Sequence, residues 1–223
     1  MNKSIFKLLI IIPISLYSCK GKKSVEQDQE QIKTTDTLTM ETQQLFNPAD
    51  LPEEPVFDII TTMGTIRIKL YKETPKHRDN FVKLASEGYY NNILFHRVIN
   101  GFMIQTGDPL TKDTLNSDKF GTGGPGYNVP AEILPQFNHK KGALAAARRG
   151  DQANPQRESS GSQFYLVQDP QACKQLDGAY TVFGETITGE NVIDLIASVP
   201  VNHRDRPLND VKIISITPVR ESR

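Results

Sequence analysis

Tryptophan is absent from the 223-residue sequence, and apolar residues make up only 37% of it. Fully globular chains usually have more of both, so we expect part of the length to be unfolded. Lysine and arginine number 26, as do aspartate and glutamate, so the formal net charge is zero. This balance favours neither a nucleic acid nor an acidic surface as partner. The apolar run at residues 8–16 is too short for the roughly 20 residues of a membrane-spanning helix.

The same run has the features of a secretory signal. Lys3 and Lys7 precede it, and Leu16-Tyr17-Ser18-Cys19 follows it. A basic start followed by a short apolar core predicts a signal peptide over residues 1–18. The segment ending at Cys19 resembles the bacterial lipobox, in which a signal peptidase cuts just before a lipid-modified cysteine. The resemblance implies lipidation at Cys19 and a protein anchored in the bacterial cell envelope, facing the periplasm.

Only two cysteines are present, Cys19 and Cys173. A structural disulfide between them is the alternative interpretation for an exported protein. Cys173 lies in a polar stretch, Asp-Pro-Gln-Ala-Cys-Lys, with no cationic or histidine neighbour that would lower its pKa. We therefore expect a lone thiol there, with no catalytic role.

A change in composition divides the chain. Residues 20–51 are rich in Lys, Gln, Glu, Thr and Asp, and no helical or strand period persists through them. We predict that residues 19–52 form a lipidated flexible tether and that residues 53–220 form one domain. A long flexible tether suits a monomer.

Short elements predominate in this domain. The alternation at residues 56–71 predicts a hairpin turning near Gly64. Thr74 and Pro75 begin a helix that Gly88 ends, and a second helix is predicted at residues 190–198. The remaining apolar runs, at residues 93–105, 142–147, 163–168, 181–184 and 211–218, are short and separated by glycine and proline. Many short strands with two helices favour a mainly all-β barrel or sandwich.

One segment brings several functional groups together. It runs Phe95-His-Arg-Val-Ile-Asn-Gly-Phe-Met-Ile-Gln-Thr-Gly-Asp108. A turn at Asn100-Gly101, with Phe102 beginning the second strand, would gather a guanidinium, an aromatic ring, a thioether and an amide. These groups belong to Arg97, Phe102, Met103 and Gln105.

Two later segments add apolar groups. Gly161-Ser-Gln-Phe-Tyr-Leu-Val167 places Phe164 and Tyr165 on opposite faces of a strand, and Leu176-Asp-Gly-Ala-Tyr-Thr-Val-Phe-Gly184 adds Leu176 and Tyr180. We assign the phenylalanines at 95, 164 and 183 to the core, where aromatic strand residues usually pack.

These three segments closely resemble the cyclophilin family in order and approximate spacing, and the resemblance extends over residues 57–219. It implies a closed eight-stranded antiparallel barrel with a short helix over each end and a shallow proline-binding groove on the outside. It also implies peptidyl-prolyl cis-trans isomerase activity, with Arg97 as the catalytic arginine assisted by Gln105 and Phe102. The implied substrate-binding residues are Met103, Ala147, Tyr165, Leu176 and Tyr180.

The chemistry of this reaction suits those residue types. Rotation about a peptide C–N bond has a barrier of about 18–20 kcal/mol, and an X-Pro bond isomerises unaided over tens to hundreds of seconds. A fixed guanidinium in a dry site can draw density onto the prolyl nitrogen as it becomes pyramidal, without a nucleophile, metal or cofactor. Gln105 can either orient Arg97 or hold the substrate carbonyl. The expected partners are proline-containing unfolded or exported polypeptides, and the alternative is a non-catalytic chaperone or scaffold module that binds proline segments.

Two departures from the family pattern bear on ligands. Eukaryotic members commonly have a tryptophan immediately before the Leu-Asp-Gly run, where it helps to bind cyclosporin, whereas this chain has Gln175. The resemblance therefore implies weak cyclosporin binding. The loop at residues 148–160 is also longer than is usual, and Arg148 and Arg149 at its start are candidates for altering peptide preference.

Other motifs in the sequence do not support a dinucleotide site, a metal site or a hydrolase. Gly121-Thr-Gly-Gly-Pro-Gly126 matches a dinucleotide fingerprint, but Pro125 and Pro130 obstruct the helix that this motif requires, so we predict a loop at the groove edge. The four histidines have no metal-ligand spacing, and the serine of Ser160-Gly-Ser162 lacks a nucleophile-elbow context. A zinc site or a hydrolase is therefore not predicted.

Overall fold

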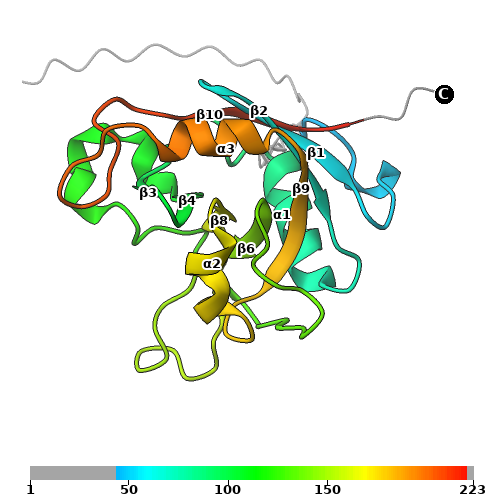
Figure 1. Cartoon of the computed structure of the whole chain (residues 1–223). Coiled ribbons are helices and arrows are strands. Elements are labelled where there is room, and N and C mark those ends of the chain that lie inside the picture. The colour runs from blue at the N-terminus through cyan, green and yellow to red at the C-terminus, as the bar shows by residue number, and fades with distance from the viewer. Residues whose placement is uncertain (1–43, 220–223) are drawn as a thin grey trace, which may run out of the picture. The chain divides into compact units, whose positions relative to one another are not determined.

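The computed structural model describes residues 44–219 (Figure 1). The predicted signal peptide, Cys19 and most of the predicted tether lie outside these residues. Within residues 44–219, every helix is too short or too polar to cross a bilayer.

Eight strands form one antiparallel sheet in the order β10-β1-β2-β9-β6-β8-β4-β3. Their bounds are β1 Val56–Thr61, β2 Gly64–Leu70, β3 Arg97–Ile99, β4 Met103–Thr106, β6 Ala143–Ala146, β8 Phe164–Val167, β9 Val182–Thr188 and β10 Ile213–Pro218. A separate pair consists of β5 Asn128–Val129 and β7 Ser159–Ser160. The predicted mainly-β class is confirmed, as is the hairpin at Gly64.

The two edges of the curled sheet meet through the segments just before β3 and β10. Leu94 forms an isolated antiparallel bridge with Lys212. On either side of this bridge, the Phe95 amide donates to the Val211 carbonyl at 2.9 Å, and the Ile213 amide donates to the Ile93 carbonyl at 2.8 Å. The expected closure therefore comes from one short bridge between these segments, and not from a ladder between β3 and β10.

Both predicted helices form, as α1 (Pro75–Ser86) and α3 (Glu190–Ala197). A third helix, α2 (Pro170–Cys173), corrects the expected count of two. It forms because the Asp169 side chain accepts the Gln171 amide at 2.8 Å and because Pro170 is preset for a first helical turn. Cys173 is therefore a buried helical residue and not part of a polar loop. The 3-10 helices are Pro48–Asp50, Pro109–Lys112, Thr114–Lys119 and Lys174–Leu176.

Strands β4, β6 and β8 are buried on both faces, which creates two cores. Successive side chains on a strand point to opposite faces. On one face of these strands, Leu144, Phe164 and Leu166 join the main core, which includes the apolar faces of α1 and α3 and the predicted Phe95 and Phe183. On the other face lies a smaller core that contains Met103, Ala143, Ala145, Tyr165, Val167 and Cys173. We call this second group the outer cluster.

The packed part of the domain begins before Pro52. The Leu45 amide donates to the Ser86 carbonyl at 2.7 Å, and the Phe46 ring lies 5.7 Å from the Phe57 ring, centre to centre. Phe46 and Leu51 pack against the main core. Residues 45–51, which composition assigns to the tether, are therefore part of the folded unit.

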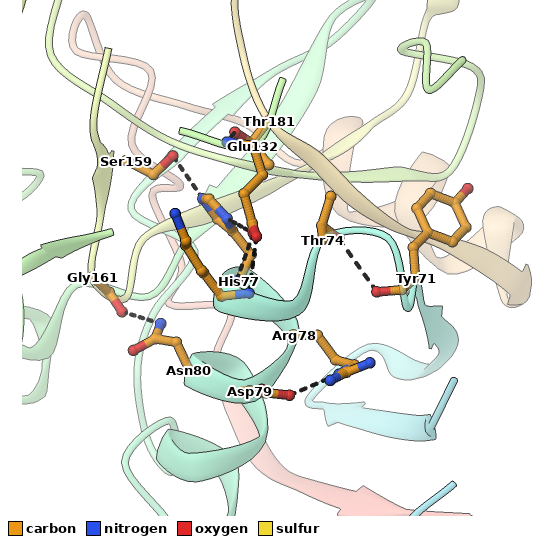
Figure 2. A network of polar contacts seen from close by, with 11 residues as sticks. Tyr71, Thr74, His77, Arg78, Asp79, Asn80, Glu132, Ser159, Gly161 and Thr181 are labelled. Carbon is orange, nitrogen blue, oxygen red and sulfur yellow. Dashed lines mark hydrogen bonds and ion pairs between the residues drawn. The ribbon is translucent and has the colours of Figure 1, made fainter. Parts of the chain in front are cut away.

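A polar network fixes the amino-terminal turn of α1 (Figure 2). Glu132 accepts the Lys76 and His77 amides, each at 3.0 Å, and its carboxylate lies 2.7 Å from His77 Nδ1. His77 Nε2 in turn lies 2.9 Å from Ser159 Oγ. This serine, histidine and acid arrangement resembles a hydrolase site, but Ser159 is only 1% exposed and cannot meet a substrate. The network is therefore a helix cap that joins α1 to β7.

Candidate functional site

The β3–β4 hairpin positions the predicted catalytic residues. Arg97 pairs directly with Gln105 across the two strands. Gly101 takes the left-handed conformation, with a φ of 75°, which a tight turn requires and glycine tolerates. Phe102 lies in this turn, because β4 begins only at Met103, so the expectation that Phe102 starts the strand is corrected. Its carbonyl accepts the amides of Gln168 and Asp169, which fixes the turn against the segment leading into α2.

The other predicted residues come from separate elements. Tyr165 on β8 pairs with Gln105 on one side and with Ala145 on the other, so it belongs to the outer face of the sheet. Ala147 follows β6, while Leu176 and Tyr180 border the loop that enters β9. All of them pack against or belong to the outer cluster.

These elements enclose a cavity of about 240 Å³, which we call the small cavity. Every residue predicted for catalysis or substrate binding within the domain lines it, together with Arg148, a predicted candidate for altering peptide preference. The lining consists of Arg97, Phe102, Met103, Gln105, Ala147, Arg148, Tyr165, Leu176 and Tyr180. The structure therefore brings the three sequence segments together at one place.

Arg97 borders the small cavity but is not in a dry site. Its side chain is 43% exposed, and its nearest charged partner is Asp205, with Nε and Oδ2 3.8 Å apart. Ion pairs with this exposure contribute little free energy. The guanidinium is therefore accessible to a ligand, and the expectation of a dry site is corrected to a partly exposed one.

Gln105 is held by a residue that the sequence interpretation did not assign. Its Nε2 donates to the Gln163 side-chain oxygen at 3.0 Å, and the Gln163 amide nitrogen donates to the Gly123 carbonyl at 2.8 Å. Within residues 44–219, the Gln105 side chain makes no hydrogen bond to the Arg97 side chain. Gln163 lies two residues before Tyr165, and strand alternation could have placed it on the same face.

Arg148, predicted as a candidate for altering peptide preference, also lines the small cavity. Its side chain is only 4% exposed, and its guanidinium stacks over the Tyr180 ring at 4.3 Å. Arg148 Nε donates to the Ala179 carbonyl at 2.9 Å, and Nη1 donates to Asp151 at 2.6 Å. It therefore forms a fixed wall of the small cavity, and Asp151 from the long loop holds it there.

A larger cavity of about 1030 Å³ adjoins the first and shares Gln105, Ala147 and Arg148 with it. The glycine-rich segment at residues 121–126 lines it, as predicted for a loop at the groove edge. Asp108, which is fully buried, accepts the amides of Gly121 and Gly123 at 2.5 and 3.2 Å. These amides already serve an internal carboxylate, which is unlike the arrangement of a phosphate-binding loop.

Burial keeps two ionisable groups near the small cavity neutral at pH 7, the Cys173 thiol and the His96 ring. Burial, with Asp169 and Asp177 nearby, raises the pKa of the Cys173 thiol to about 12. Burial also lowers the pKa of His96, the neighbour of Arg97, to about 4. At neutral pH, Arg97 and Arg148 are therefore the charged side chains that line this cavity.

Fold and cavity together define a mainly-β domain with a guanidinium-bordered cavity, lined by both apolar and polar side chains, on the outer face of its sheet. A family model described as cyclophilin type peptidyl-prolyl cis-trans isomerase/CLD matches residues 56–218. The chain belongs to the cyclophilin-type peptidyl-prolyl cis-trans isomerase family, and so to a class of enzymes that rotate the X-Pro bond.

Individual relatives agree with this assignment. The peptidyl-prolyl cis-trans isomerase-like 1 protein of Aspergillus fumigatus is 40% identical over 168 residues, covering 74% of this chain and 95% of the relative. The peptidyl-prolyl cis-trans isomerase-like 3 protein of Gallus gallus is 41% identical over 160 residues, covering 70% and 91%. A crystal structure of a Cryptosporidium parvum cyclophilin type isomerase in the presence of the dipeptide Ala-Pro superposes with a TM-score of 0.65 at 29% identity, covering 74% of this chain and 99% of that one.

Proposed function

We propose that the chain catalyses cis-trans isomerisation of X-Pro bonds at the small cavity, with Arg97 as the catalytic residue, and thereby assists the folding of exported polypeptides. The observation that carries this proposal is that one cavity of about 240 Å³ is lined by all eight residues that the sequence motifs implied for catalysis and substrate binding. The reaction consumes no ATP, which suits a location outside the cytoplasm.

The apolar wall would receive the proline ring. Phe102, Met103 and Tyr165 contribute two aromatic rings and a thioether, and Met103 and Tyr165 are fixed in the outer cluster. A pocket of this kind gains free energy from apolar contact, and its few polar groups orient the ligand. Gln105 lies beside this wall, where its side-chain amide can hold a carbonyl next to the proline.

Arg97 would supply the electrostatic contribution. In the transition state the prolyl nitrogen is pyramidal and carries a free lone pair, which accepts a hydrogen bond from a guanidinium N–H. Because Arg97 is 43% exposed in the free domain, a bound peptide must displace water before this interaction reaches full strength. The peptide itself would thus complete the dry site, and the twisted amide would bind more strongly than the planar one.

A protease-coupled assay on a tetrapeptide containing Ala-Pro tests this proposal. We expect Arg97→Ala to lower kcat/KM by about 10²-fold or more. The matched control is Arg204→Ala, which removes an exposed arginine outside the small cavity and should leave the rate unchanged. If the wild type and Arg97→Ala were equally slow, the alternative function, a non-catalytic proline-binding chaperone or scaffold module, would replace the enzyme.

We propose a membrane location through a lipid on Cys19, with the chain as a monomer in the bacterial cell envelope. The support comes from the sequence, in which Lys3, Lys7 and a short apolar run precede Leu16-Tyr17-Ser18-Cys19. We also propose weak binding of cyclosporin. Gln175, at the position where the family resemblance implies a tryptophan, is exposed, and its amide donates to the Ala172 carbonyl at 3.3 Å.

A further inference from the structure

Tyr165 carries a hydroxyl group that an apolar wall does not need. The residue is 4% exposed, and its ring belongs to the outer cluster beneath the small cavity. A buried hydroxyl without a partner costs about 1–3 kcal/mol, so its hydrogen bond has to be accounted for. The partner is His139, whose Nε2 lies 2.8 Å from the Tyr165 oxygen.

His139 is itself held in one orientation. Its side chain is fully buried, and its Nδ1 lies 2.7 Å from the Asp177 carboxylate. The same carboxylate oxygen accepts the His139 backbone amide at 2.8 Å. A carboxylate accepts, so Nδ1 carries the ring proton, and in the neutral ring Nε2 is then the acceptor for the Tyr165 hydroxyl.

We propose that His139 is a positioning residue for the isomerase site: with Asp177, it binds the Tyr165 hydroxyl away from the small cavity and so presents the ring as an apolar wall for proline. Asp177 directly follows the cavity residue Leu176, so this network also ties the loop entering β9 to the floor of the cavity. The inference deepens the proposed function and rests on it.

The surroundings of the network favour the neutral ring that this role requires. Burial lowers the pKa of His139, and Asp177 offsets this effect only in part. Burial also raises the pKa of Tyr165 well above its ordinary value, so its hydroxyl keeps the proton it donates. The Tyr180 ring meets the rings of His139 and Tyr165 edge to face, at 6.4 and 6.2 Å, and completes the enclosure.

A double-substitution cycle separates positioning from general packing. We expect His139→Phe in the full chain to raise the Kd of an Ala-Ala-Pro-Phe tetrapeptide about five- to tenfold, because the freed hydroxyl turns toward the cavity. In the Tyr165→Phe background, where no hydroxyl needs a partner, the same change should raise Kd by less than about twofold. His203→Phe, at an exposed histidine outside the network, is the control. Equal effects of His139→Phe in both backgrounds would overturn the proposal.

Long-range ¹H–¹⁵N NMR of the unsubstituted chain provides a second test that does not depend on a variant folding. The proposal predicts a neutral His139 ring at pH 7, protonated at Nδ1 and bare at Nε2. A charged ring, or a proton on Nε2, would overturn it. Peptide affinity and ring protonation are both measured without turnover. A failure of the proposed isomerase activity, measured in the protease-coupled assay, can therefore be distinguished from a failure of the positioning role.

Discussion

The Glu132 carboxylate joins its own loop to the first turn of α1 by accepting the Lys76 and His77 amides. Burial by itself raises the pKa of its carboxyl, but the His77 side chain and the Lys76 and His77 amides more than offset this, so the pKa lies below its ordinary value. A depressed carboxyl pKa in the folded state stabilises the fold above the unfolded pKa, and this stabilisation is lost as pH falls through the folded value.

We therefore expect Glu132→Gln to lower the free energy of unfolding at pH 7 by about 1–2 kcal/mol, the scale of charge-assisted hydrogen bonds. The deficit relative to wild type should shrink as the pH falls from the ordinary pKa of a glutamate carboxyl through the lower folded-state pKa, because the wild-type carboxyl then becomes protonated. Urea unfolding at a series of pH values measures this difference. A deficit that stayed constant with pH would contradict the assignment.

Cyclosporin binding is also expected to depend on a single residue, Gln175. We expect inhibition of isomerase activity by cyclosporin to require more than micromolar concentrations, and Gln175→Trp to tighten it, because an indole supplies apolar area that an exposed amide does not. Lys174→Trp, at the neighbouring exposed position, controls for non-specific binding to an added exposed indole. Submicromolar inhibition of the unsubstituted chain would refute the prediction.

Individual site residues could be predicted where they belong to a recognisable run. Arg97, Phe102 and Gln105 lie within one segment of 14 residues, and all reach the small cavity. His139 was not assigned, because its role depends on Tyr165, which is distant in sequence. No local pattern marks a side chain whose partner comes from another element.

At the scale of elements, the glycine-rich segment is fixed by internal contacts. A Cβ at Gly123 would overlap the buried Asp108 carboxylate. At Gly124 the atom nearest to an added Cβ would be Ser160 Oγ, at an ordinary contact distance of 3.9 Å. We expect Gly123→Ala to lower the free energy of unfolding by about 1–3 kcal/mol, as overpacking does. Gly124→Ala, the matched control, should change it by less than about 0.5 kcal/mol. Equal effects in chemical unfolding would disprove the anchoring role of Asp108.

Most elements could be predicted because their signals are local. Pro75 and Gly88 bound α1, and the hairpin at Gly64 follows from alternation. The short helix α2 was missed although Asp169-Pro170 is a start signal, because only four residues follow it and no apolar period can form. The pair β5–β7 has two residues in each strand, which is too short for any alternation to be visible.

For the whole molecule, the eight-stranded antiparallel sheet follows from many short apolar runs, but its closure does not. The bridge between Leu94 and Lys212 joins segments more than one hundred residues apart, and such a contact has no local signature. Similarly, Phe46 lies in a polar region without a period, so its packing on Phe57 could not be foreseen.

The membrane anchor is also a property of the whole molecule. Cells grown with labelled palmitate should incorporate label into the unsubstituted chain, and Cys19→Ser should abolish it. Cys173→Ser is the control, because that thiol is buried and should not be labelled. Retention of label in Cys19→Ser would reject the anchor.

The positively charged Arg97 side chain, beside the apolar wall of the small cavity, is proposed to lower the barrier to prolyl rotation. Two-dimensional NMR exchange spectroscopy on an Ala-Ala-Pro-Phe tetrapeptide tests it most directly, because rotation and binding are observed together. With the unsubstituted chain we predict exchange peaks between the cis and trans proline signals. The free peptide should show none, because its uncatalysed isomerisation takes about tens to hundreds of seconds. With Arg97→Ala we predict the loss of these peaks while the peptide still binds. Exchange peaks of equal strength with Arg97→Ala would contradict the account.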